Sequence, residues 1–301
     1  MSLIEEAREA WRYRELLKNL VDRELQVRYK NSVLGVVWSL ANPIVRAAIL
    51  WAVFSLIVPL KIDNYSAYVL AAFFPWTFFL TGVLDAGDSV SRQMSLVRKV
   101  YFPRELLPLA TTIANLRHFF LSLGVLAIYL IVQYNYNWWI KGHHELPPSE
   151  IFLLPLLIVM ETLLIGGIAF FLSAMNVFFE DVKFLTAVVL DLLFYGVPII
   201  YFIEQVQFTD RLGALGPLVY HIFLLNPMTI VLVGYRTFLL GPSTGPLGPD
   251  SHTIIPVNVG FGTANGIPWV YFFLAFAVSV AAFAGGYAFF NSRKWRFVEQ
   301  M

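Results

Sequence analysis

The side chains of this chain that could do chemistry are scattered between long apolar stretches. No Gly-x-x-x-x-Gly-Lys-Ser/Thr run is present, so ATP binding by a phosphate loop is excluded. The chain has no cysteine, and its adjacent His143 and His144 are typical of a solvated polar loop rather than of a metal site. Carboxylates such as Glu161 and Asp191 stand apart from any second acid or base. The sequence therefore predicts no catalytic group and no metal site.

The elements that carry these side chains are long apolar segments. Hydrophobic residues make up 58% of the chain and charged residues 14%, against roughly a quarter charged in soluble domains. Six stretches have the twenty or so apolar residues that are needed to cross a bilayer. They are Val33–Leu60, Tyr65–Leu84, Leu106–Val132, Ile151–Phe179, Phe184–Ile203 and Ile267–Phe290. We predict an all-α integral membrane protein with six transmembrane helices.

A seventh apolar stretch, Pro217–Leu240, is interrupted by Asn226 and Pro227. Proline removes a backbone donor and clashes with the preceding helical turn. Each half is too short to cross about 30 Å of hydrocarbon at about 1.5 Å per residue. We therefore predict a re-entrant helical hairpin on the outer side, within an outer re-entrant region that spans residues 204–266.

The basic residues predict the orientation of these segments. With six spans, fifteen of the 21 Lys and Arg residues fall on the side of both termini, and such residues favour the cytoplasm. The predicted parts are an interface helix in residues 1–32, a membrane domain in 33–291 with a cytosolic loop at 85–105, and a cytosolic tail at 292–301. The amphipathic stretch Arg8–Lys30 either lies among lipid headgroups or docks on protein as a cytosolic helix.

Ionisable residues inside the apolar segments are costly in lipid and face protein or water. This set comprises Arg46, Arg117, His118, Glu161 and Asp191. Two interpretations stay open. Either they pair across helices, for instance Arg117 with Glu161, or some of them line a hydrated path.

The predicted cytosolic loop 85–105 has the features of a docking element. Val90, Met94 and Val97 recur at helical spacing, and a basic pair precedes a run that is stiffened by Pro103. A short helix held by a proline turn can press into a groove on a partner protein. The alternative is that the basic residues of this loop only follow the orientation rule.

The run Leu96–Pro108 resembles the corresponding loop in permease subunits of ABC exporters for wall teichoic acid, O-antigen and capsular polysaccharide. The resemblance continues through Arg14–Pro43, Asn176–Val182, and Leu225–Thr229 with the Tyr235-Arg236 pair, and so covers nearly the whole chain. One departure is Glu180-Asp181, where many relatives have Arg-Asp. Arg46 and Asp191 are also unusually charged for their positions.

The resemblance implies a homodimer that works with two copies of a separate ATPase, which holds ATP and Mg²⁺, while this chain needs no cofactor. The implied cargo is a polysaccharide or teichoic acid on an undecaprenyl diphosphate carrier, moved across the bacterial cytoplasmic membrane among membrane lipids. No nucleic acid is expected as a partner. Alternatives are an exporter of drugs or small lipids, a membrane-bound transferase acting on lipid-linked sugars, and a secondary transporter with two similar halves.

Four groups of candidate residues follow from the resemblance together with the residue patterns. ATPase coupling would use Arg98, Lys99, Tyr101, Phe102, Pro103, Arg104, Glu105, Glu180 and Asp181. The entrance for the lipid diphosphate would use Arg23, Arg28 and Lys30. The aromatic lining of a channel along the dimer axis would use Trp38, Trp51, Phe54, Trp76 and Tyr195. The outer gate would use Asn226, Pro227, Thr229, Tyr235 and Arg236.

Overall fold

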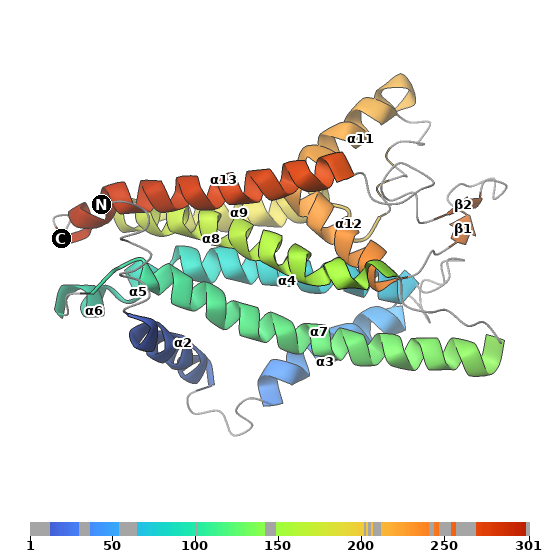
Figure 1. The fold of residues 1–301 in the computed structure, drawn as a ribbon, viewed down its shortest axis with the longest axis horizontal. Coiled ribbons are helices and arrows are strands. Elements are labelled where there is room, and N and C mark those ends of the chain that lie inside the picture. Colours follow the sequence, from blue (N-terminus) through green and yellow to red (C-terminus); the bar gives the residue numbers. More distant parts are fainter. Residues whose placement is uncertain are drawn as a thin grey trace.

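The chain folds into an elongated bundle of helices (Figure 1). The computed structural model describes residues 13–29, 37–53, 65–99, 102–141, 149–201, 203, 206, 212–240, 244–246, 254–256 and 269–298. The longer helices are α2 (Arg14–Tyr29), α3 (Val37–Ala52), α4 (Tyr65–Gly87), α7 (Leu106–Lys141), α8 (Leu154–Phe178), α9 (Asp181–Gly196), α11 (Gly216–Leu225), α12 (Pro227–Leu239) and α13 (Trp269–Arg293). The shorter elements are α5 (Ser89–Arg92), α6 (Met94–Lys99), η2 (Ser149–Leu153), η3 (Gly213–Leu215) and η5 (Lys294–Val298).

Four helical segments of the described chain are long and apolar enough to cross a membrane. They are Tyr65–Gly87, Leu106–Asn135, Glu150–Phe178 and Trp269–Phe297. The bent pair α11 and α12 raises the number to five if it counts as one span. The protein is therefore a helical, multi-pass membrane protein, and the predicted total of six spans is met only in part.

The two predicted spans that fall short have different causes. Helix α9 has 16 residues and ends at Gly196, because the following Val197 precedes Pro198 and takes an extended backbone with φ −115° and ψ 149°. A residue before proline is disfavoured in the helical region. Helix α3 also has 16 residues in the described part, while 33–36 and 54–60 of the predicted span lie outside the described residues.

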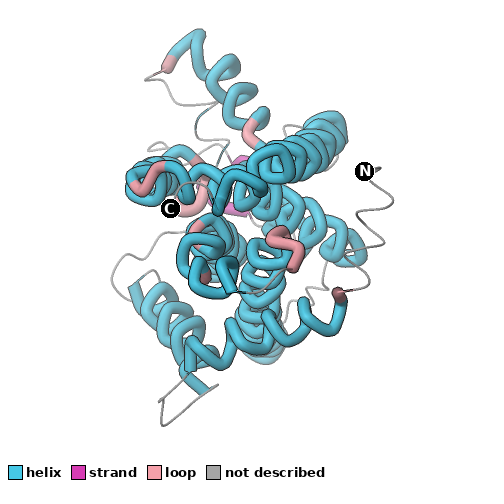
Figure 2. The backbone as a smooth tube through the Cα atoms, turned by 90° about the vertical axis from the view of Figure 1, so that its left-hand side faces the viewer, coloured by secondary structure: helices cyan, strands magenta, loops and turns pink. Residues whose placement is uncertain are grey.

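Helix α4 lies at the centre of the bundle, in contact with α3, α7, α8, α9 and α12. Its span is 72% buried within this single chain, and Figure 2 shows the neighbouring helices end-on around the bundle. Phe78 of α4 stacks on Phe119 of α7 at 4.6 Å between ring centroids. Phe119 in turn meets the edge of the Tyr235 ring of α12 at 5.9 Å. This aromatic series joins three helices through the core.

Helices α8 and α13 approach each other so closely that only glycine fits at the crossing. A Cβ atom on Gly167 would lie 2.5 Å from the carbonyl oxygen of Ala282, and one on Gly286 would lie 2.0 Å from the carbonyl oxygen of Gly167. Small residues are used in this way in membranes because close backbone packing replaces the hydrophobic drive of water. The crossing fixes the carboxyl-terminal helix against the centre of the chain.

The predicted break at Asn226 and Pro227 is confirmed. The side chain of Asn226 accepts a hydrogen bond from the backbone N–H of Met228 at 3.0 Å, and Pro227 occupies the first turn of α12. An asparagine cap followed by proline is a strong helix start. Helices α11 and α12 meet at 91°. Whether this pair is re-entrant or a broken span stays a prediction.

The two ends of the elongated bundle carry different helices and strands (Figure 1). One end carries α2, α5, α6 and η5, which continues from α13. The other end carries strands β1 (Thr244–Pro246) and β2 (Ile254–Pro256), which pair antiparallel with Gly245 opposite Ile255. This strand pair was not predicted. We call the end with α2 the inner end and the other the outer end, following the predicted orientation.

The α8–α13 crossing gives a first prediction. Gly286→Ala places a methyl group against rigid backbone and should lower the melting temperature of the detergent-solubilised protein by several degrees, because overpacking costs about 1–3 kcal/mol. Gly285→Ala is the matched control, since a Cβ there meets no atom within 4 Å, and alanine favours the helix. Equal melting temperatures for the two variants would contradict the close crossing.

Candidate functional site

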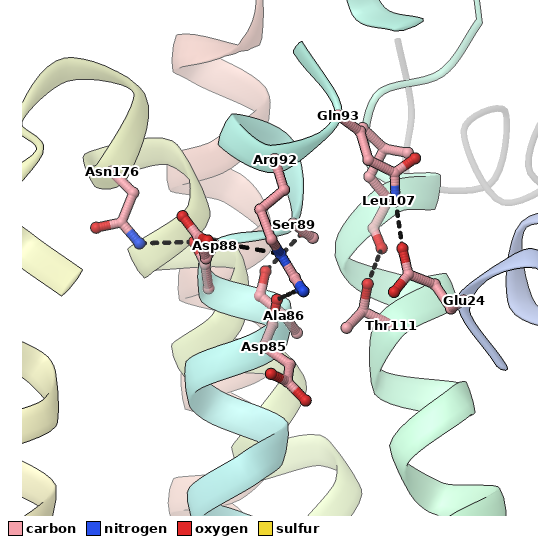
Figure 3. Close-up of polar contacts among 11 residues, drawn as sticks. Glu24, Asp85, Ala86, Asp88, Ser89, Arg92, Gln93, Leu107, Thr111 and Asn176 are labelled. Atoms are coloured by element: carbon pink, nitrogen blue, oxygen red, sulfur yellow. Dashed lines mark hydrogen bonds and ion pairs between the residues drawn. The ribbon is translucent and has the colours of Figure 1, made fainter. Parts of the chain in front are cut away.

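At the inner end, hydrogen bonds join helix α2 to the bundle. Arg117 of α7 donates a hydrogen bond to Asp22 of α2 at 2.7 Å, and Gln93 donates one to Glu24 (Figure 3). Leu20 is buried on the same helix. The apolar face of α2 thus lies on protein. Because Arg117 pairs with Asp22, its considered pairing with Glu161 is wrong.

The junction between α4 and α5 is also tightly bonded (Figure 3). Asn176 of α8 donates a hydrogen bond to the carbonyl of Gly87 at 2.8 Å. Arg92 donates one to the carbonyl of Asp85 at 2.5 Å and pairs with Asp88 at 3.5 Å. These contacts tie the predicted loop 85–105 to the ends of α4 and α8.

Asp88, at the start of α5, lies near the turn between α8 and α9. Burial raises the pKa of the Asp88 carboxyl above its usual value, opposed by the positive charges of Arg92 and Lys183 and assisted by the negative charge of Asp85. Lys183 lies in the first turn of α9, two residues after the predicted contact residue Asp181. The two predicted cytosolic loops therefore lie side by side.

The stretch Phe102–Glu105 makes contacts inside the chain. Phe102 is only 7% exposed and packs in an apolar cluster with Leu106 and Phe297. Arg104 donates a hydrogen bond to the carbonyl of Lys294 and lies 6.0 Å from the Phe297 ring. The ring of Phe102 completes an apolar cluster within the chain, and its predicted role in ATPase coupling stays a prediction.

Glu105 forms the second link between this stretch and η5. Its carboxylate accepts a hydrogen bond from the Lys294 ammonium at 3.4 Å, and both side chains are largely buried. The role in ATPase coupling predicted for Glu105 and Arg104 stays a prediction beside these contacts within the chain. Both residues hold η5, and with it α13, to the start of α7.

The remaining candidate residues at the inner end differ in how exposed their side chains are. Lys99, Glu180 and Asp181 are exposed, as is the predicted entrance residue Arg23, while Pro103 is half-buried. Tyr101 and Lys30 lie outside the described residues, and the side chains of Arg98 and Arg28 are likewise not described. The exposed side chains that the structure brings together at the two loops are thus mixed in charge.

In the outer half of the bundle, Arg236 of α12 is buried at 4% exposure. Its guanidinium donates to the carbonyl oxygens of Tyr68, Pro198 and Ile199 at 3.0, 2.5 and 2.5 Å. It also donates to the Tyr68 hydroxyl at 2.8 Å and lies 3.5 Å from the centre of that ring. Irregular backbone at membrane depth persists only where protein or water satisfies its polar groups. Arg236 does this for the unwound end of α9.

The neighbouring Tyr235 makes a second buried polar contact. Its hydroxyl donates to the Glu161 carboxylate at 3.0 Å, and both residues are fully buried. The other Glu161 oxygen has no hydrogen-bond partner in the described part of the chain. Together these contacts correct the prediction that Tyr235 and Arg236 meet an emerging polymer, because both side chains point into the protein. Thr229 is likewise fully buried.

The aromatic candidates do not form one lining in a single chain. Trp76 is buried at 2% exposure and meets the edge of Phe194 at 5.9 Å, which corrects its assignment to a channel surface. Trp51 and Tyr195 are exposed. Trp51 also borders an apolar hollow of about 780 Å³ between α3 and α7. Phe54 lies outside the described residues, and the side chain of Trp38 is not described.

The fold defines a helical, multi-pass membrane protein with buried polar contacts between its helices. The family model described as ABC-2 type transporter matches residues 15–239. The chain belongs to this family, and it is a transport permease rather than an enzyme, since the ATPase of such a transporter is a separate subunit.

Similar proteins extend this assignment. The chain is 28% identical over 234 residues to an O-antigen export system permease protein RfbA from Myxococcus xanthus, covering 78% of this chain and 84% of that protein. Two proteins of the same name from Klebsiella pneumoniae are 24% and 25% identical over 287 residues, which is 95% of this chain and 94% of each relative.

The Arg236 contacts give a second prediction. Arg236→Ala leaves the carbonyls of Pro198 and Ile199 buried without a donor, at a cost of about 1–3 kcal/mol for each group. The detergent-solubilised variant should melt well below the wild type. Arg236→Lys should fall in between, because an ammonium keeps the charge and loses the planar fork.

The matched control is Arg293→Ala at an exposed arginine on α13. It should leave the melting temperature nearly unchanged. A melting temperature for Arg236→Ala equal to that of the control would show that the guanidinium does not hold the outer half together.

Proposed function

We propose that this chain is the membrane subunit of an ATP-driven exporter that moves a polysaccharide or teichoic acid, linked to undecaprenyl diphosphate, across the bacterial cytoplasmic membrane. The observation that carries the proposal is similarity over 95% of the chain to O-antigen export permeases, with 94% of their length covered. Membership of the ABC-2 family supports the same conclusion.

The partner that hydrolyses ATP is a separate chain in this proposal. This sequence has no phosphate loop, and the family to which it belongs is that of ABC-2 type transporters. A homodimer of permeases with two ATPase subunits, holding ATP and Mg²⁺, is the assembly we propose. Both termini then lie in the cytosol, as the distribution of Lys and Arg indicates.

The inner end supplies the ATPase-docking surface. Asp88, at the start of α5, lies close enough to Lys183 of α9 for their charges to interact, so α5 lies near the turn at Glu180 and Asp181. Arg23 on α2 belongs to the same end and is proposed, with Arg28 and Lys30, to meet the arriving diphosphate, because guanidinium groups bind phosphate oxygens bidentately. At the outer end, the α11–α12 pair is proposed to be a re-entrant hairpin that covers the exit.

The proposal predicts a defined loss in cells. Deleting the gene should abolish the polymer on the cell surface and accumulate its lipid-linked precursor inside, and the wild-type gene should restore export.

The double variant Lys99→Glu with Lys183→Glu should reach the membrane at normal levels but co-purify less ATPase and export less polymer, because it reverses exposed charges at the docking surface.

The control is Lys18→Glu, at another exposed lysine, on α2. It should leave co-purification unchanged. Normal surface polymer in the deletion strain would contradict the proposed function, whereas full co-purification by the Lys99 and Lys183 variant would contradict only the docking surface.

A further inference from the structure

Helix α13 carries its extension η5 to the membrane boundary at the inner end. The segment Trp269–Phe297 is long and apolar enough to cross a membrane, and η5 continues directly from α13 (Figure 1). The 25 residues of α13, at about 1.5 Å per residue, measure about 37 Å, which is more than the roughly 30 Å of the hydrocarbon core. Tryptophan gathers at both boundaries of a membrane, and Trp269 and Trp295 stand at opposite ends of this segment. η5 therefore lies at the level of the lipid headgroups.

Buried contacts hold η5 in one orientation. The Phe297 ring is fully buried and meets the Phe290 ring edge-on at 5.4 Å between centroids. The Lys294 carbonyl accepts a hydrogen bond from Arg104, and the Lys294 ammonium donates one to Glu105 at 3.4 Å. η5 is thus a folded part of the protein, and this packing fixes the directions in which its other side chains point.

Away from the bundle, this end of the chain presents a tryptophan and two arginines. Trp295 is 64% exposed, and Arg293 and Arg296 are exposed as well. Residues three apart lie on the same side of a helical turn. Lys294 and Phe297 therefore share the side that faces the protein, while Arg293 and Arg296 share another. We call Arg293, Trp295 and Arg296 the outward patch.

The two arginines of the outward patch have no acidic partner in the described part of the chain. Arg293 lies 5.6 Å from the centre of the Phe289 ring, which leaves its charge uncompensated. Lys294, between the two arginines, is paired with Glu105. Like charges one turn apart on a helix repel each other. The patch therefore favours an anion that comes from outside the chain.

We infer that the outward patch binds the phosphate headgroup of an anionic phospholipid in the membrane layer at the inner end. Guanidinium groups bind phosphate oxygens bidentately, and basic side chains beside an anionic membrane surface favour binding to it. The exposed indole of Trp295 suits the boundary between headgroups and acyl chains. Because η5 is already folded, the patch is presented without the ordering cost of a loose tail. The inference holds whichever polymer the protein moves.

Quenching of tryptophan fluorescence tests this contact. The full chain would be reconstituted in phosphatidylcholine vesicles with a minor fraction of a lipid brominated near its headgroup, either phosphatidylglycerol or phosphatidylcholine. Brominated phosphatidylglycerol should quench more strongly, because the patch enriches the anionic lipid about tenfold or more. Most of this excess quenching should be lost in Trp295→Phe and kept in Trp269→Phe, the matched control at the opposite end of the span.

Removal of the two charges tests the arginines. Arg293→Gln with Arg296→Gln should remove most of the excess quenching. Arg293→Lys with Arg296→Lys should keep part of it, because an ammonium retains the charge but lacks the planar fork. The control Lys99→Gln with Lys183→Gln removes two exposed positive charges elsewhere at the inner end and should keep the excess. Added salt should reduce the excess in the wild type, since it screens exposed charges.

Three results would overturn the inference. Equal quenching by the two brominated lipids in the wild type would show that the patch does not select an anionic headgroup. An equal loss of the excess in the lysine control would show only a general attraction of the basic inner end to the membrane. Unchanged excess quenching in the Arg293 and Arg296 variants, together with less co-purified ATPase, would make the patch a contact for the ATPase instead.

Discussion

The outer half of this membrane protein depends on one buried guanidinium. Arg236 donates hydrogen bonds to the carbonyl oxygens of Tyr68, Pro198 and Ile199. These bonds join α12 to the start of α4 and to the unwound end of α9. The energetic reason is direct: a backbone carbonyl without a donor is costly in an apolar environment. The early end of α9 is tolerated because this side chain donates hydrogen bonds to the carbonyls of Pro198 and Ile199 that follow it.

The inner half is held by weaker and more exposed contacts. The Asp22–Arg117 pair has side chains that are 42% and 46% exposed, and exposed pairs contribute about 0–1 kcal/mol. The Glu105–Lys294 pair is more buried but joins only η5 to the start of α7. The most buried polar contacts thus lie where the backbone is irregular in the outer half, whereas the exposed Asp22–Arg117 pair lies at the end proposed to receive an ATPase.

Sequence patterns predicted the features that depend on local chemistry. The apolar lengths predicted four of the spans, and Asn226 with Pro227 predicted the break, because a cap and a proline act on their own backbone. Pro198 was a local signal for the early end of α9 as well. The span Phe184–Ile203 was predicted from its apolar length, without regard to this proline. The directions of Tyr235, Arg236 and Trp76 could not be read, since a helix that is apolar all round gives no facing information.

The same limit applies to the inner end. A proline-stiffened basic run is compatible both with docking on a partner and with internal packing, and the sequence does not show that Phe102 completes a cluster with Phe297. Arg46 and Asp191 stood out by charge alone, whereas their exposure on the folded chain needed the structure. What remained beyond the sequence was thus the set of long-range contacts between residues far apart in the chain.

Transport by the purified complex tests the central claim most directly. The permease and its ATPase would be reconstituted in proteoliposomes that carry a lipid-linked polysaccharide, and the glycan that becomes accessible to an added glycosidase on the far leaflet would be measured. The expected result is an accessibility that rises only with hydrolysable ATP and only when the permease is present. Equal accessibility without ATP, or in liposomes that lack this chain, would contradict a polysaccharide exporter.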